Sequence, residues 1–200
     1  MIDKTNFQKF LKHNKLTISA VEFTGSLSNN DIEPYIWDKL NKNHSSQRKI
    51  IIQYLETHLK PSLPTSIVIH DVFQSRNFLN IMTEESPFLF KTQGSTDLIL
   101  AEKSYIDGLI PTSGIHCIME FKKSVQEQHI MQVVPEIAAA DFLTNDEIKT
   151  IGVLTDLNSS WHLFWLSEEK KFKTVKFSNH KKAIETIDKM VSLKCMLGLS

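Results

Sequence analysis

Hydrophobic positions along the chain alternate between strand-like and helix-like spacing, which predicts a mixed α/β structure. Short β-branched or apolar runs bounded by turn residues indicate strands. Such runs occupy 66–70, 88–90, 96–101, 115–121, 150–155, 161–166 and 172–177. The runs at 96–101 and 115–121 follow one another through a connection that contains Gly and Pro. We therefore expect these two strands to be neighbours in one sheet.

Apolar residues at helical spacing predict two helices before the first of these strands. One helix is expected over 31–40, with Asp31 as its N-cap and Pro34 in its first turn. The next is expected over 46–59, because Pro61 would end it. Together they would form a helical hairpin.

Two more helices are expected later in the chain. Residues 126–143 carry apolar side chains at helical spacing. Pro135 removes an amide donor there, so the helix either kinks at that residue or begins near Val134. A closing amphipathic helix is expected from about Asn179. The first thirty residues are weakly patterned, with one short apolar run at 16–23.

Length and composition favour one domain with a sizeable core. The 200 residues are 41% hydrophobic and 23% charged, enough for a single core over 1–200. We expect a helical N-terminal cover over 1–62, a core of sheet and helix over 63–178, and a closing helix over 179–200. No apolar run reaches the length of a membrane span, so no membrane partner is expected.

Charge is balanced over the whole chain but not along it. Twenty-three basic and twenty-three acidic residues give zero formal charge, which argues against a protein that coats nucleic acid nonspecifically. Six lysines without an intervening carboxylate nevertheless lie between 170 and 182. They suit either an edge strand whose lysines discourage pairing or a patch that faces phosphates.

The run at 115–121 ends in residues that can carry chemistry. Residues two apart share a face of a strand, so Glu120 and Lys122 project together with His116 and Ile118. If Asp97 lies beside them on the neighbouring strand, two carboxylates form a hard-oxygen pocket suited to Mg²⁺ or Mn²⁺. Such an ion polarises a phosphoryl oxygen and activates water, which a lysine can position. The pattern predicts phosphodiester hydrolysis.

The Glu-x-Lys string by itself indicates little, because the chain contains it four times. The four pairs are Glu120 with Lys122, Glu147 with Lys149, Glu168 with Lys170, and Glu169 with Lys171. Only the first ends an uninterrupted apolar run, follows an apolar strand with an aspartate and precedes a helix. The alternative for this pair is a surface ion pair worth 0 to about 1 kcal/mol.

These residues resemble the motif of the PD-(D/E)xK nuclease superfamily. Asp97, then Glu120-Phe121-Lys122, then a helix with Gln132 and Glu136 match its pattern, with Ser95-Thr96-Asp97 where many members have proline and aspartate. Residues 90–167 more narrowly resemble the nuclease-like C-terminal domains of Crinkler-type effector proteins. The segments that carry this likeness are 94–97, 118–123, 132–140, 152–157 and 161–166.

The resemblance implies a restriction-endonuclease-like αβββαβ core with a mixed central sheet flanked by helices. It also implies that Asp97, Glu120 and the backbone carbonyl of Phe121 bind Mg²⁺ or Mn²⁺, and that Lys122 handles the attacking water.

Three further roles are open at this point. Many members of the superfamily add an acidic ligand from the helix before the sheet, and both Glu33 and Glu56 are eligible. Gln132 matches a glutamine that organises the site or contacts DNA. Glu136 either buttresses Lys122 or is an exposed helix carboxylate.

The sequence thus predicts a metal-dependent endonuclease or exonuclease that acts on nucleic acid, with DNA as the expected substrate. The alternative is a catalytically inactive nuclease-like fold that binds nucleic acid or protein. The resemblance to effectors implies a protein that works inside cells, in a host cell or its nucleus.

Overall fold

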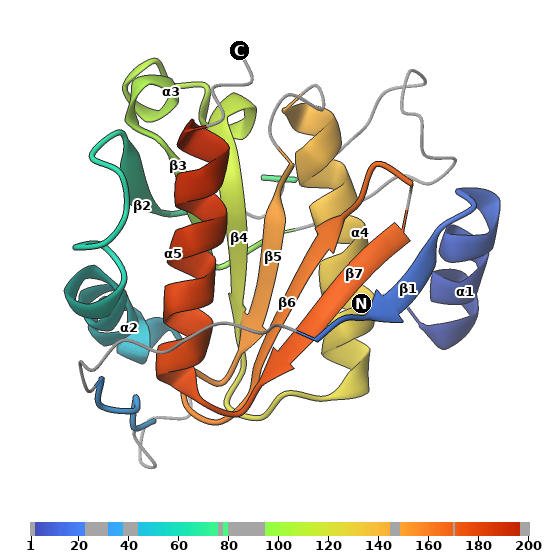
Figure 1. Ribbon diagram of the computed structural model, residues 1–200, viewed down its shortest axis with the longest axis horizontal. Coiled ribbons are helices and arrows are strands. Elements are labelled where there is room, and N and C mark those ends of the chain that lie inside the picture. The colour runs from blue at the N-terminus through green and yellow to red at the C-terminus, as the bar shows by residue number, and fades with distance from the viewer. Residues whose placement is uncertain are drawn as a thin grey trace.

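The described residues form a seven-stranded sheet, in the order β1-β7-β6-β5-β4-β3-β2. A computed structural model describes residues 3–22, 32–37, 44–75, 78–79, 95–144, 149–169 and 171–196. Figure 1 shows α2 and α5 in front of the sheet and α4 behind it. This arrangement confirms the predicted α/β class, a mixed sheet flanked by helices.

The described helices are α1 (Lys4–His13), α2 (His44–His58), α3 (Lys103–Asp107), α4 (Glu127–Leu143) and α5 (His180–Met196), with a 3₁₀ turn η1 (Pro111–Gly114). The strands are β1 (Thr17–Ala20), β2 (Ile67–Asp71), β3 (Leu98–Glu102), β4 (Ile115–Phe121), β5 (Ile151–Thr155), β6 (Trp161–Leu166) and β7 (Lys171–Phe177). From α2 to β5 the elements follow the expected αβββαβ order, with α3 and η1 inserted between β3 and β4. The apolar run at 88–90 lies outside the described residues.

The sheet is mixed because of two parallel pairs. Strands β2, β3 and β4 form an antiparallel meander, and so do β5, β6 and β7. Strand β4 pairs parallel with β5, since α4 returns the chain to the same end of the sheet. Strand β1 pairs parallel with β7.

The pairing of β1 corrects one expectation about the lysine-rich segment. Strand β7 lies between β1 and β6, so the prediction of an edge strand there is wrong. Strand β1 was hard to recognise because three of its four residues are exposed and give no alternating pattern. Because β1 pairs with β7, residues 1–62 contribute a strand to the sheet as well as helices.

The expected helical hairpin is wrong in its first half. Helix α2 confirms the second half, but residues 32–37 have no helical structure. Tyr35 is buried, and the Trp37 indole N–H donates to the Asp156 carbonyl at 2.6 Å. These contacts with the rest of the molecule outweigh the helical spacing of the apolar residues. Asp31 and residues 38–40 lie outside the described residues.

Helix α4 continues through Pro135 and begins at Glu127, so a start near Val134 is wrong. The Gln126 backbone N–H donates to His129 Nδ1 at 3.0 Å, which caps the first turn. Pro135 itself is buried among apolar neighbours. Packing of this helix against the sheet therefore offsets the hydrogen bond that proline cannot make.

The two faces of the sheet each carry an apolar cluster, as the alternation in β4 predicts. Cys117, Met119 and Phe121 pack with residues of α2 and α5. Ile118 packs on the opposite face with residues of α4. Within the described part of the chain, no helix is long and apolar enough to cross a membrane.

Candidate active site

The candidate site lies at the C-terminal end of β4, where the chain turns toward α4. Glu120 is the last but one residue of that strand and is only 3% exposed. Lys122 follows the strand directly, and its Nζ donates to Glu120 Oε2 at 2.8 Å. Because the carboxylate is buried, the alternative of a surface ion pair is wrong for these two residues.

Asp97 joins the site from the residue just before β3. Its backbone N–H donates to the Met119 carbonyl at 3.1 Å, and its Oδ2 accepts the Phe121 N–H at 2.8 Å. The neighbouring Thr96 hydroxyl also donates to the Met119 carbonyl, at 2.9 Å. The side chain of Asp97 is thus tied to the strand that carries Glu120.

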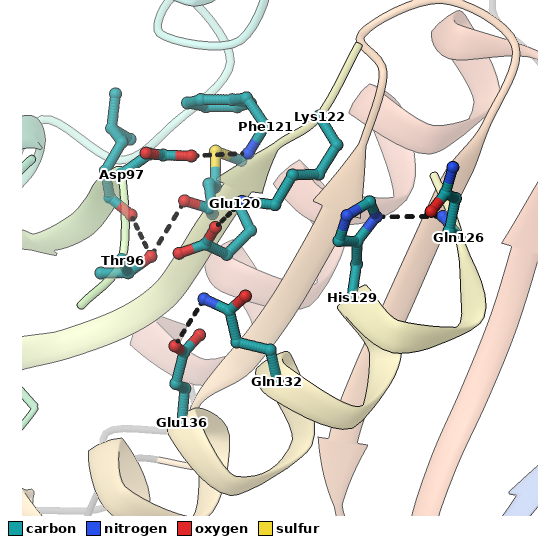
Figure 2. Close-up of polar contacts among 11 residues, drawn as sticks. Thr96, Asp97, Glu120, Phe121, Lys122, Gln126, His129, Gln132 and Glu136 are labelled. Atoms are coloured by element: carbon teal, nitrogen blue, oxygen red, sulfur yellow. Dashed lines mark hydrogen bonds and ion pairs between the residues drawn. The ribbon is translucent and has the colours of Figure 1, made fainter. Parts of the chain in front are cut away.

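Helix α4 adds two polar residues that point toward Glu120 (Figure 2). Gln132 Nε2 donates to Glu136 Oε1 at 3.1 Å. Glu136 is 4% exposed, so its alternative reading as an exposed helix carboxylate is wrong. Its second oxygen, Oε2, is buried and has no hydrogen-bond partner among the described residues.

Burial and mutual repulsion raise the pKa values of the two glutamates. Desolvation is the largest cause for Glu120 and the Asp97 charge adds to it, while Lys122 opposes both; the pKa of Glu120 rises to about 8. The pKa of Glu136 is raised by desolvation and then by the Glu120 charge, against the effects of Gln132 and Lys122. The site therefore concentrates more acidic groups than its one lysine neutralises.

Lys122 remains a cation in these surroundings. Burial by itself would lower the pKa of Lys122, but the nearby carboxyl groups of Glu120, Asp97 and Glu136 raise it above its usual value. A lysine with a raised pKa holds its proton at neutral pH. Lys122 is thus suited to stabilise negative charge, and poorly suited to accept a proton.

The donor chemistry fits a hard cation, although the described side chains do not form a ready-made ion site. Three carboxyl groups and an unpartnered buried oxygen are the ligand type that Mg²⁺ and Mn²⁺ prefer. Within the described ranges, however, no three His, Cys, Asp or Glu side chains form a group that could hold a metal ion as they stand. Asp97 and Glu120 each commit one oxygen to a protein donor. A bound ion would have to displace or share these contacts.

The structure brings neither Glu33 nor Glu56 to this cluster. Both side chains are exposed, and the charge of Glu33 acts on His58 in α2. Glu136 is the acidic residue that joins Asp97 and Glu120. The sequence gives one indication that Glu136 is buried, because this residue lies between Pro135 and Ile137 within a long apolar stretch of the helix.

Arg48 of α2 is a neighbour of the site that sequence reasoning missed. It lines a cavity together with Asp97 and Phe121, and the Asp97 charge partly offsets the lowering of the pKa of Arg48 by burial. Arg48 is one of two arginines in the chain. The rarity of arginine is the only feature of the sequence that marks Arg48. The spacing of residues along α2 does not predict which of them lies near Asp97.

The sequence of this chain is distantly similar to two curated proteins. It is 26% identical over 152 residues to Crinkler effector protein 63 of Phytophthora sojae (strain P6497), an alignment that covers 69% of this chain and 32% of that protein. It is 29% identical over 94 residues to Crinkler effector protein 161 of the same organism, covering 45% of this chain and 20% of that protein.

The chain spans about a third or less of the length of these curated relatives. No protein-family model matches it, and no solved structure matches it. The resemblance to Crinkler effector proteins is therefore supported. These comparisons do not test the nuclease-like part of that resemblance or membership of the PD-(D/E)xK superfamily. The chain is a distant homologue of Crinkler effector proteins.

Proposed function

We propose that this chain is a metal-dependent nuclease that hydrolyses phosphodiester bonds. The observation that carries the proposal is the buried Glu120–Lys122 ion pair at the end of β4, with Asp97 tied to the same strand end. A buried ion pair is weak support for stability, since desolvation offsets much of its attraction. Its position beside the buried Glu136 and the half-buried Asp97 is better explained by chemistry than by folding.

Each residue has a role that follows from its contacts. Asp97, Glu120 and the Phe121 carbonyl would hold Mg²⁺ or Mn²⁺, and Glu136 would add its unpartnered oxygen. The ion, when bound, supplies Lewis acidity and an activated water. Lys122 presents a fixed positive charge to the phosphoryl oxygens, where negative charge develops. Gln132 orients Glu136 through the hydrogen bond that it donates.

Cleavage of a mixed set of DNA and RNA substrates with and without Mg²⁺ tests the proposal. We expect metal-dependent cleavage by the wild type and its loss in Asp97→Ala and Lys122→Ala. Lys171→Ala is the matched control, because Lys171 forms an exposed Glu-x-Lys ion pair with Glu169 at 2.6 Å. Equal activity in all four proteins would remove the catalytic assignment.

A second function is favoured by one specific observation. No metal-binding group of three side chains is assembled within the described residues, which suits a nuclease-like fold that binds nucleic acid or protein without turnover. Calorimetry with Mn²⁺ separates the two. A nuclease should bind the ion with an affinity that falls in Glu120→Gln, whereas a binding module should release no heat with either protein.

The relatives extend the proposal to a biological setting. Both are named effector proteins, and we propose that this chain serves as the nucleic-acid-directed part of such an effector, inside a host cell. The substrate that we expect is DNA. Comparing cleavage rates on DNA and RNA strands of the same sequence tests that expectation, and faster cleavage of RNA would contradict it.

A further inference from the structure

A hollow of about 540 Å³ lies between α2 and the end of β2 and leads toward the candidate site. Arg48, Lys49 and Ile52 of the helix form one wall, while Asp71 and Phe73 form the other. Four of these five residues also line the narrow cavity that reaches Asp97. We call this continuous depression the Arg48–Phe73 groove. Its volume is in the range of a pocket for a small ligand.

Arg48 lines both hollows, at the point where they meet. Its guanidinium forms an ion pair with Asp71 and lies 4.4 Å from the centre of the Phe73 ring. Its Nε is buried without a hydrogen-bond partner among the described residues. These contacts hold the Arg48 side chain between Asp71 and the Phe73 ring.

The Phe73 ring is presented to the groove by a turn that Asp71 stabilises. Asp71 Oδ1 accepts the Phe73 backbone N–H at 3.3 Å. The ring remains 37% exposed, although Arg48 lies against it. An exposed aromatic ring beside cationic side chains is the combination on which unpaired bases stack.

Lys49 adds a positive charge that no acidic side chain of the described residues balances. It is exposed on the same hollow, and it has no ion-pair partner within the described ranges. Since Arg48 is neutralised by Asp71, Lys49 gives this end of the groove its net positive charge. This positive charge attracts a phosphate and repels a cationic peptide.

We infer that the Arg48–Phe73 groove binds an unpaired nucleotide next to the phosphodiester that enters the candidate site. In this arrangement Phe73 stacks on the base, while the exposed Lys49 contacts the phosphate. A paired base cannot offer its face to a side chain without leaving the helix. The substrate class is therefore a single strand or a frayed end, an inference that rests on the proposed function.

Binding of a short fluorescent oligonucleotide in EDTA, followed by anisotropy, tests this inference without cleavage. Phe73→Ala should weaken binding of a single strand about tenfold and leave its salt dependence unchanged, because stacking releases no counterions. Lys49→Ala should reduce the slope of log affinity against log salt by about 0.7, the value for one phosphate contact on a single strand. The wild type should bind the single strand more tightly than the duplex.

Two control variants change residues near the opposite edge of the sheet that are as exposed as the test residues. Ile18 in β1 is 37% exposed, like Phe73, and Lys12 in α1 is exposed, like Lys49. Ile18→Ala and Lys12→Ala should bind as the wild type does. The inference is overturned if either test variant binds like the wild type, if a control loses as much affinity, or if the duplex binds more tightly.

The results also separate this inference from the proposed function. If both variants show their expected signatures but Mg²⁺ supports no cleavage, the groove stands and the nuclease proposal fails. If the wild type cleaves and the two variants bind unchanged, the nuclease proposal stands and the groove fails.

Discussion

Glutamine at position 120 would keep the shape of the side chain and remove its ionisable group. Glu120 is buried, and its pKa is raised to about 8, mainly by burial and then by Asp97. A carboxyl group with a higher pKa in the folded protein than in the unfolded one stabilises the fold at low pH. This contribution is complete below the usual pKa of 4.5 and is lost as the pH rises to about 8. The corresponding free energy is at most about 5 kcal/mol.

We therefore expect the free energy of unfolding of the metal-free wild type to fall between pH 4.5 and pH 8. Glu120→Gln should show a much smaller fall and be the more stable protein at pH 8. Some fall should persist, because the pKa of Glu136 is raised as well. Saturating Mg²⁺ should restore stability to the wild type, by about 2.7 kcal/mol at a hundredfold excess over Kd, and should restore less to the variant.

Urea unfolding followed by tryptophan fluorescence measures these differences, since Trp161 is fully buried in the fold. The experiment compares the wild type and Glu120→Gln in EDTA across this pH range. Glu169→Gln is the control, because Glu169 is exposed beside Lys171 and should leave the pH profile unchanged. A flat profile in the wild type, or an equal fall in the Glu120 variant, would refute the reasoning about burial.

Three more predictions concern the surroundings of the site. Gly152→Ala should destabilise the fold by about 1–3 kcal/mol in urea unfolding, because an added Cβ would meet Ile137 Cδ1 at 2.2 Å; wild-type stability would contradict this. Thr96→Val should cost about 1 kcal/mol in the same assay, since the hydroxyl donates to the buried Met119 carbonyl, and no loss would argue against that hydrogen bond. Burial raises the pKa of Tyr54 to about 12, so Tyr54→Phe should remove a phenolate absorbance step at about that pH, and an unchanged titration would refute it.

The sequence predicted best the elements whose pattern is local. Strand β4 and helix α4 were recognised because an apolar run and a helical stripe reflect burial on neighbouring turns or alternate residues. For the segment 32–37, the same kind of pattern predicted a helix that the structure does not contain. Its tryptophan side chain contacts Asp156, which lies 119 positions away, and spacing along a short segment does not register such a contact.

The sequence by itself determined that Glu120 and Lys122 share a strand face, that Asp97 belongs to the apolar run expected as the neighbouring strand, and that a helix follows. Alternation along a strand is a property of the backbone and needs no knowledge of the rest of the fold. Only the tertiary structure decided that Glu136 joins these residues and that Arg48 approaches Asp97. Both depend on which helix packs over which face of the sheet. That choice is made by burial and pairing between segments far apart in the chain, which local patterns do not specify.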